Sequence, residues 1–412
     1  MANAFSKEER AAFDDILMGF NDALTISKNI AKYGTNGELM ERANDTIYRP
    51  VPYILNSQDR TVGSSVSAQD ATQLKVPCTL DQQKNVTWTL DALELRDQLQ
   101  EGRLGKSAYQ RLASDVNTKV RDVVSLEGTL VHAVSGAAGT YNDVASAEVL
   151  MLEQGLESYE RYMALTATDY NGLANNLSTA SRSFGNKKSD DAYEKSYVGM
   201  IAGFGTLKID AGKQLAANGA TVTIATNGSI PDQVPSSTVD NRTQQVTVST
   251  TTGVTAGDCF TIAGIEAVHH ITKESTGRLK TFRVISVDDG TTMTISPKMV
   301  SGAGASDAEL QYQNINVASE SATAAITFLN DTATGANPFW CKESVVLMPS
   351  RYAVPDGQGV DIMRGTTDQG IEVTMGKSFS NLTFKSTYTL DVRYGVTNLN
   401  PEMNGVILFN QS

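Results

Sequence analysis

The fold is decided by two neighbouring stretches, Val239-Asp-Asn-Arg-Thr-Gln-Gln-Val-Thr-Val-Ser249 and Thr251-Thr-Gly-Val-Thr-Ala-Gly-Asp-Cys-Phe-Thr-Ile-Ala-Gly264. Val246 and Val248 alternate with polar residues, as expected of a strand with one buried face and one solvated face. Glycines then interrupt the chain before the alternation resumes. The pattern predicts a compact module of short β-strands.

The same pattern returns further along the chain. Residues 282–287 and 293–295 flank Asp289-Gly290, and Asp-Gly between two β-rich runs is a strong hairpin signal. Residues 90–200, in contrast, have mostly helical spacing. We therefore predict that an all-β module, residues 213–328, is inserted into an α+β host domain.

The N-terminal segment predicts an amphipathic helix. Ser6 and Glu9 have the spacing of a capping box. Apolar residues then recur every three to four positions: Phe13, Ile16, Leu17 and Phe20. An arm that does not bury such a stripe in its own subunit buries it against a partner, so we predict this face as a subunit contact. Packing within its own subunit is the alternative.

Other host elements follow from periodicity and composition. Apolar residues at helical spacing between 104 and 134 predict a helix of about 20 to 28 residues, interrupted only at Gly128. Residues 56–73 are too polar for a core and predict a long exposed loop or hairpin. Residues 163–167 are a candidate central strand, and residues 371–394 predict two long antiparallel strands.

The composition favours a structural protein. The 412-residue chain has a net charge of −12, which disfavours sequence-specific DNA binding, and no apolar run long enough to span a membrane. The N-terminus has no apolar signal segment, so we expect synthesis in the cytoplasm. Cys78, Cys259 and Cys341 lack metal or disulfide spacing and are expected to be small buried apolar residues.

No group of residues predicts catalysis. His132 is expected on the long helix, and adjacent His269 and His270 would point to opposite faces of a strand, which disfavours chelation of one ion. The chain lacks the Gly-x-Ser-x-Gly motif of many hydrolases, and residues 205–213 lack the spacing of a phosphate-binding loop. We therefore expect no enzymatic activity, no metal site and no cofactor.

Short motifs over nearly the whole chain resemble those of one family. They are, in order, Asn44-Asp-Thr-Ile-Tyr-Arg-Pro-Val51, Leu93-x-Leu-Arg96, Ala164-Leu-Thr-Ala-Thr-Asp-Tyr170, Val198-Gly-Met-Ile-Ala-Gly-Phe204, Val239-Asp-Asn-Arg242, Thr251-Thr-Gly253, Gly257-Asp258, Ala263-Gly264, Val287-Asp-Asp-Gly290, Ile295-Ser-Pro-Lys298 and Asn337-Pro-Phe-Trp340. In order and spacing they resemble the major capsid proteins of short-tailed phages. In that family the coat subunit has the Hong-Kong-phage-type capsid fold with an inserted telokin-like β-barrel.

The resemblance implies an α+β subunit with a spine helix and five parts. In chain order these are an N-terminal arm (1–36), the extended loop and spine helix of a peripheral domain (37–135), an axial domain (136–212), the inserted β-barrel domain (213–328), and the axial return with C-terminal peripheral strands (329–412).

The resemblance also implies a function. Such subunits self-assemble as pentamers and hexamers into the icosahedral head of a tailed bacteriophage. The procapsid forms in the host cytoplasm with a scaffolding protein, then expands as double-stranded DNA is packaged. The implied partners are other copies of the chain, a scaffolding protein, a portal protein and DNA bound non-specifically, with no membrane, and the implied location is the virion.

Contact residues are carried over position by position. Asp14, with Asp15 beside it, matches an acidic position that receives a basic helix of the scaffold, and charge pairing there would be salt-sensitive. For a contact through the extended loop, the candidates are Asp59, Arg60 and Asp70.

The loop of the inserted domain reaches a neighbouring capsomer in that family. The candidates here are Asn227, Ile230, Asp232 and Val234. Residues 227–238 carry a single charge, so the family's salt-bridge mechanism is in doubt. Pro231 and Pro235 would instead pre-order the loop and lower the entropic cost of docking.

Two other interpretations remain open. One is a phage tail or decoration protein with an Ig-like module, which would lack the spine helix. The other is a secreted carbohydrate-active enzyme with a β accessory module, against which the missing signal segment and carboxylate pair count.

Overall fold

The computed structural model divides into two compact units. Unit 1 comprises Met1–Ile47, Cys78–Val120 and Val346–Thr397, and unit 2 comprises Tyr48–Pro77, Arg121–Val345 and Asn398–Ser412. The structure describes residues 5–32, 46–51, 55, 57, 60, 62–63, 65, 68, 70–100, 103–155, 160–180, 187–210, 212–225, 242–302, 307–317, 323–350, 352 and 361–412.

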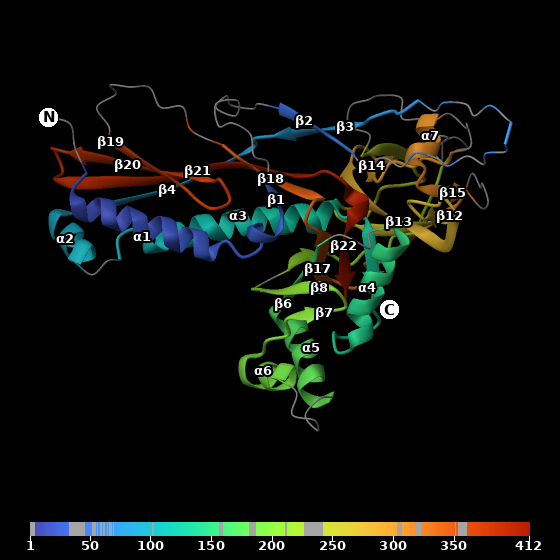
Figure 1. Cartoon of the computed structure of the whole chain (residues 1–412), viewed down its shortest axis with the longest axis horizontal. Helices are drawn as coiled ribbons and strands as arrows, with labels where there is room; N and C mark the ends of the chain where they lie inside the picture. The colour runs from blue at the N-terminus through green and yellow to red at the C-terminus, as the bar shows by residue number, and fades with distance from the viewer. Residues whose placement is uncertain are drawn as a thin grey trace. The chain divides into compact units, whose positions relative to one another are not determined.

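Unit 1 is built on one mixed sheet (Figure 1). Its strand order is β1 (Ala31–Lys32), β18 (Val345–Pro349), β21 (Lys385–Asn398), β20 (Glu372–Ser380) and β19 (Asp361–Thr366), and β4 (Gln82–Leu90) also pairs with β21. Strands β20 and β21 pair antiparallel, which confirms the prediction for residues 371–394.

Helices cover one face of this sheet. Tyr388 and Tyr394 of β21 are an even number of positions apart, so their buried side chains lie on the same face of the sheet. The Tyr388 hydroxyl donates to Glu9 of α1 (Lys7–Ala23), and the Tyr394 hydroxyl donates to the Asp115 carbonyl of α3 (Lys106–Glu127). Helices α1 and α3 therefore lie on that face. Among the described residues of this unit, the other helices are the short α2 (Ala92–Gln100) and η1 (Ser27–Asn29).

The predicted long helix ends earlier than expected. Helix α3 stops at Glu127, and the chain enters β5 (Leu130–Ala133), which pairs in parallel with β22 (Asn404–Leu408). Leu130 and Val131 continue the apolar spacing of the helix, but they are buried as strand residues. The expectation that His132 lies on the helix is therefore corrected to a place on β5.

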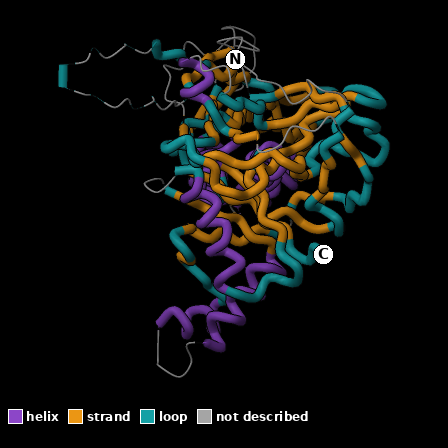
Figure 2. Tube along the Cα trace, turned by 90° about the vertical axis from the view of Figure 1, so that its right-hand side faces the viewer, coloured by secondary structure: helices purple, strands orange, loops and turns teal. Residues whose placement is uncertain are grey.

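Unit 2 contains a mixed central sheet. Its order is β5, β22, β17 (Thr334–Cys341), β6 (Arg161–Thr166), β8 (Phe204–Ile209) and β7 (Met200–Ile201), and β9 (Lys213–Leu215) pairs with β17. Strand β6 is central, as predicted. On β22, Ile407 packs with α4 (Tyr141–Glu153) and α5 (Ala167–Ala180), while Val406 and Leu408 face the other side. Helices α5 and α6 (Lys187–Lys195) lie together at the bottom of Figures 1 and 2.

A second sheet of unit 2 contains the predicted β module. Its order is β10 (Val222–Thr223), β16 (Ala325–Phe328), β12 (Cys259–Val268), β13 (Ser275–Val287), β14 (Thr292–Ser296) and β11 (Gln244–Thr247), with β15 (Ile315–Val317) on β12. A bridge between Ile224 and Val248 joins its two ends, which closes the sheet on itself as in a β-barrel.

The local predictions inside this module agree with the structure. Strands β13 and β14 form the hairpin around Asp289-Gly290, and Val246 and Val248 are buried. At the expected start of the module, β9 pairs with β17 of the central sheet. His269 and His270 follow β12 in a turn rather than on a strand.

The polar segment lies between the paired strands β2 (Thr46–Pro50) and β3 (Lys75–Thr79). Every described residue between 55 and 70 is exposed, as the sequence predicts. The part of unit 2 that the structure describes also contains α7 (Asp307–Tyr312) and the short η4 (Pro401–Met403).

Candidate functional site

Helix α1 begins at the predicted capping box. The Ser6 hydroxyl accepts a hydrogen bond from the Glu9 backbone N–H at 3.2 Å, and the Glu9 carboxylate accepts one from the Ser6 backbone N–H at 2.9 Å. Together these bonds satisfy backbone donors that a helix start leaves unpaired.

The apolar face of α1 packs within unit 1, which corrects its assignment as a subunit contact. Phe13, Ile16 and Phe20 are at most 5% exposed, and Leu17 is half-buried. The Phe13 and Leu17 side chains lie against Gly365 of β19, where a Cβ atom would meet them at 3.1 and 2.8 Å. The alternative in which the stripe packs on its own subunit is the one that the structure shows.

A buried charge fixes α1 to the sheet of unit 1. The Glu9 carboxylate is 2% exposed and accepts hydrogen bonds from Lys377 Nζ at 2.6 Å and from the Tyr388 hydroxyl. Burial alone would raise the pKa of Glu9, but the bonds from Lys377, Tyr388 and the Ser6 backbone outweigh it and lower that pKa.

The opposite side of α1 is acidic and meets solvent. Asp14 and Asp15 are both exposed, and Met18 beside them is 62% exposed. The two carboxylates are thus exposed on a helix whose opposite face packs on the sheet of unit 1.

The extended-loop candidates have different outcomes. Arg60 is exposed, and Asp59 lies outside the described residues. The backbone N–H of Asp70 donates to the Asp307 carboxylate of α7 at 2.8 Å, so this residue is engaged within its own subunit. The four candidates of the inserted loop, Asn227, Ile230, Asp232 and Val234, also lie outside the described residues.

A second buried ion pair connects the closed sheet to the C-terminal segment. Lys280 of β13, whose side chain is 3% exposed, pairs with Glu402 of η4. Burial would raise the pKa of Glu402, but Lys280 and His270 hold it low. Lys273 lies near the same carboxylate, and burial lowers the pKa of Lys273 to about 8.

His270 beside this pair predicts a loss of stability in weak acid. Burial, with Lys273 and Lys280 nearby, lowers its pKa from 6.5 to about 4, against the opposing effect of Glu402. The unfolded chain therefore takes up a proton between these values while the folded chain does not. The free energy of unfolding should fall by about 2 kcal/mol as pH falls from 6.5 to 4.

This pH dependence can be measured by urea unfolding at pH 7 and pH 5. The free energy of unfolding should differ less between pH 7 and pH 5 in His270→Asn than in the wild type. If the free energy of unfolding falls equally between pH 7 and pH 5 in both proteins, groups other than His270 cause the acid sensitivity.

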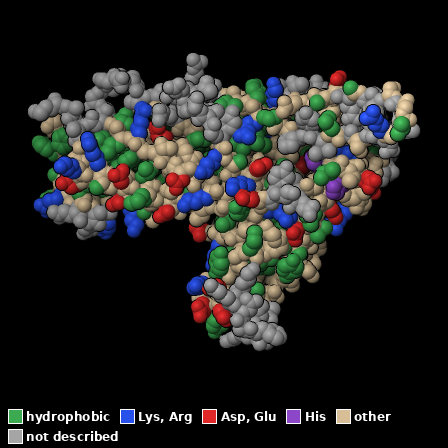
Figure 3. Space-filling view, viewed as in Figure 1, with side chains coloured by type: hydrophobic (Ala, Val, Ile, Leu, Met, Phe, Trp, Pro, Cys, Tyr) green, Lys and Arg blue, Asp and Glu red, His purple; other side chains and the backbone are tan. Residues whose placement is uncertain are grey.

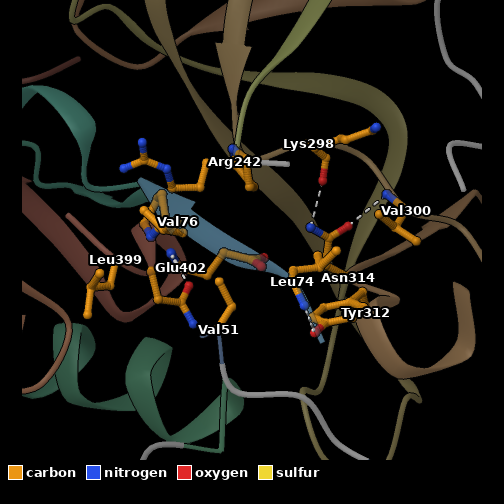
Figure 4. A pocket seen from close by; sticks show the side chains of 13 residues that line it. Val51, Leu74, Val76, Arg242, Lys298, Val300, Tyr312, Asn314, Leu399 and Glu402 are labelled. Atoms are coloured by element: carbon orange, nitrogen blue, oxygen red, sulfur yellow. Dashed lines mark hydrogen bonds between the residues drawn. The ribbon is translucent and has the colours of Figure 1, made fainter. Parts of the chain in front are cut away.

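Figure 4 shows a small pocket in unit 2 between the loop strands, the closed sheet and the C-terminal segment. It encloses about 70 Å³ and is lined by Val51, Leu74, Arg242, Lys298 and Glu402, among others. The volume is well below the ~300 Å³ of small-molecule sites, and suits a few water molecules.

The described part of the chain offers little for metal chemistry. It contains no group of three His, Cys, Asp or Glu side chains that could hold an ion. All three cysteines are buried, as predicted. Within the same residues, none of the helices combines the length and apolar character needed to cross a bilayer.

Helix α4 of unit 2 carries apolar residues on two sides. Val144 and Met151 are buried in the core below the central sheet. Tyr141, Val149 and Leu152 are 57%, 40% and 37% exposed. Figure 3 shows apolar side chains gathered on the visible surface over α4 and β7. A helix that is apolar on both sides is typical of a protein that buries the outer side in an assembly.

Comparison with known proteins identifies the family. Residues 1–410 match the family model described as P22 coat protein, gene protein 5. The chain belongs to the P22 coat protein family. This coat protein is a major capsid protein whose copies assemble into the icosahedral head of a tailed phage, and its location is the virion. Its fold class, the α+β capsid fold of the Hong-Kong-phage type, is the one predicted.

Solved phage structures are also similar to this coat protein. A capsid chain of the cyanophage P-SCSP1u is 10% identical, with 93% of this chain and 86% of that chain covered and a TM-score of 0.44. A mature capsid chain of bacteriophage PhiM1 is 9% identical, with 93% and 87% covered and a TM-score of 0.45. The CUS-3 coat protein I-domain is 39% identical, covers 27% of this chain and 94% of its own length, and has a TM-score of 0.21.

Proposed function

We propose that this coat protein assembles as pentamers and hexamers into a procapsid around a separate scaffolding protein. The shell then expands as double-stranded DNA enters through a portal protein, and the DNA contacts the shell non-specifically. Assembly takes place in the host cytoplasm. The match to the coat protein family over residues 1–410 is the observation that carries this proposal.

Each part of the chain has its own role in the shell, and the inserted domain is one of these parts. Residues 1–36 form the arm, and residues 37–135 form the extended loop and spine helix of the peripheral domain. Residues 136–212 form the axial domain, and residues 329–412 return to the axial domain and add the C-terminal peripheral strands. The closed sheet described above supports an inserted β-barrel domain within residues 213–328. Its loop, residues 227–238, reaches the next capsomer, and no catalytic step is part of the function.

Two surfaces support contacts with different partners. The exposed apolar residues of α4 suit another copy of the chain, because copies of this subunit surround one another in a closed shell. The exposed carboxylates of Asp14 and Asp15 suit a basic helix of the scaffold.

Negative-stain electron microscopy tests the proposed function. The protein should be expressed alone and together with the candidate scaffolding protein encoded beside it. Closed shells or tubes that become uniform with the scaffold support the proposal. A monodisperse monomer in both samples would contradict it.

Replacing Asp14 and Asp15 together by Asn should weaken the scaffold contact. Exposed ion pairs contribute about 0 to 1 kcal/mol each, so affinity for the scaffold should fall roughly tenfold at low salt, with a smaller effect at high salt. Sedimentation of the coat protein with the scaffold measures this change.

A matched control uses another adjacent acidic pair, Asp190 and Asp191 on α6 of unit 2. Replacing that pair by Asn should leave scaffold binding unchanged. Both double variants should keep the far-ultraviolet circular dichroism of the wild type. Equal losses in both variants would assign the effect to net charge rather than to α1.

A further inference from the structure

The base of the extended loop lies along helix α7 of the inserted region. Gln311 of α7 is 1% exposed, and its side-chain amide spans two backbone groups of the loop. Its Nε2 donates to the Asp70 carbonyl at 2.6 Å, and its Oε1 accepts from the Thr72 N–H at 3.1 Å.

The next residue of α7 repeats this arrangement two residues further along the loop. The Tyr312 hydroxyl donates to the Thr72 carbonyl at 2.9 Å and accepts from the Leu74 N–H at 3.0 Å. Figure 4 shows Tyr312 and Leu74 joined in this way. The Asp307 carboxylate accepts from the Asp70 N–H at the far end of the segment.

These contacts reproduce the pattern of a parallel β-ladder. In such a ladder a residue on one strand lies opposite residue j of the other strand. It bonds to the carbonyl of residue j−1 and to the N–H of residue j+1. Gln311 does this around residue 71, and Tyr312 does it around residue 73. Side chains of a helix therefore take the place of a neighbouring strand for residues 70–74.

Helix α7 is itself held firmly in the inserted region. Lys273 Nζ donates to the carbonyls of Gln311 and Gln313, both at 3.1 Å, where a cation is favoured at a helix C-terminus. The chain then enters β15, which pairs with β12. The loop is thus bound to a fixed part of the closed sheet rather than to another loop.

We propose that α7 is the docking site that sets the position of the extended loop, with Gln311 and Tyr312 as positioning residues. The inserted domain then determines, from within its own subunit, where the loop can reach a neighbouring subunit. This inference rests on the proposed function, in which the extended loop contacts the next subunit of the shell.

Amide hydrogen exchange of the full-length protein tests the docking directly. In Tyr312→Phe, the hydroxyl that bonds to Thr72 and Leu74 is removed while the ring remains. Exchange in a peptide covering residues 70–76 should become about tenfold faster, as expected from the loss of one or two hydrogen bonds. Gln311→Leu, which removes both the donor to Asp70 and the acceptor for Thr72, should have a similar effect.

The same variants are then assembled and imaged. Tyr312→Phe should give open or mixed-size particles where the wild type gives uniform shells. Tyr197→Phe, at an exposed tyrosine between α6 and β7, is the matched control and should change neither measurement.

Unchanged exchange in Tyr312→Phe would overturn the docking site. If Tyr312→Phe exchanges faster but still forms shells as uniform as those of the wild type, docking of the loop on α7 does not control assembly. If the wild type itself forms no shells, the proposed function fails, while the exchange result still decides whether α7 docks the loop.

Discussion

Glu402→Met should lower the free energy of unfolding by about 3 to 5 kcal/mol. The change removes the partner of the Lys280 ammonium, whose side chain is 3% exposed. Breaking one side of a buried ion pair is costly because the remaining charge is neither hydrated nor compensated. Urea unfolding at neutral pH measures the loss, as a shift of the transition midpoint at constant slope.

An exposed pair of the same unit is the control. Lys342 and Glu160 approach to 2.6 Å, but their side chains are 41% and 63% exposed. Glu160→Gln should therefore leave the transition midpoint nearly unchanged, because solvent screens an exposed ion pair.

The double variant Lys280→Met and Glu402→Met should recover much of the stability lost in Glu402→Met, because it removes the Lys280 ammonium that the single variant leaves without a partner. A double variant as unstable as the sum of the two single variants would show that packing at these positions, rather than charge, dominates. The sign of the coupling between the two changes separates these explanations.

Local patterns predicted the elements whose contacts lie nearby in the chain. The hairpin around Asp289-Gly290, the cap at Ser6 and Glu9, and the buried alternation of Val246 and Val248 all depend on residues a few positions apart. Strand β6 could also be predicted from a short continuous run of apolar residues, and β21 from the alternation of Tyr388, Leu390 and Val392, all of which are buried.

Distant pairing explains what the sequence did not predict. Leu130 and Val131 fit a helix by spacing, but parallel pairing with β22, more than 270 positions away, makes them a strand. The partners of Glu9 and Lys280 lie 368 and 122 positions away, and no local motif marks them. The apolar face of α1 was assigned to a partner because a single sequence does not show that β19 covers it.

The two buried ion pairs have a common consequence for the subunit. Each connects segments that are more than 100 positions apart in the sequence: α1 with β20, and β13 with η4. Unlike apolar contacts, such pairs tolerate little displacement, because a shifted charge loses its partner without gaining water. They therefore define the docked positions of these segments more sharply than the surrounding apolar residues do.

Glu9→Ala should release helix α1 from the sheet of unit 1. The change leaves Lys377, whose side chain is 17% exposed, without its carboxylate, removes the acceptor of Tyr388 and breaks the capping box. The combined loss should be about 3 kcal/mol, seen as faster amide exchange along α1 while the strands β20 and β21 keep their protection. Glu8→Ala, at the adjacent exposed position, is the matched control and should leave exchange nearly unchanged.

The same carboxylate makes the docking of α1 sensitive to acid. The folded pKa of Glu9 lies below its ordinary value of 4.5, so its contribution is complete above that pH and is lost as pH falls through the folded value. Amide exchange along α1 in the wild type should therefore accelerate below about pH 4.5 and approach the rate seen in Glu9→Ala. The variant, which lacks this carboxylate, should show no such acceleration over the same pH range. A step of equal size in both proteins would mean that the acidic face of α1, rather than the buried Glu9, controls the release of the helix.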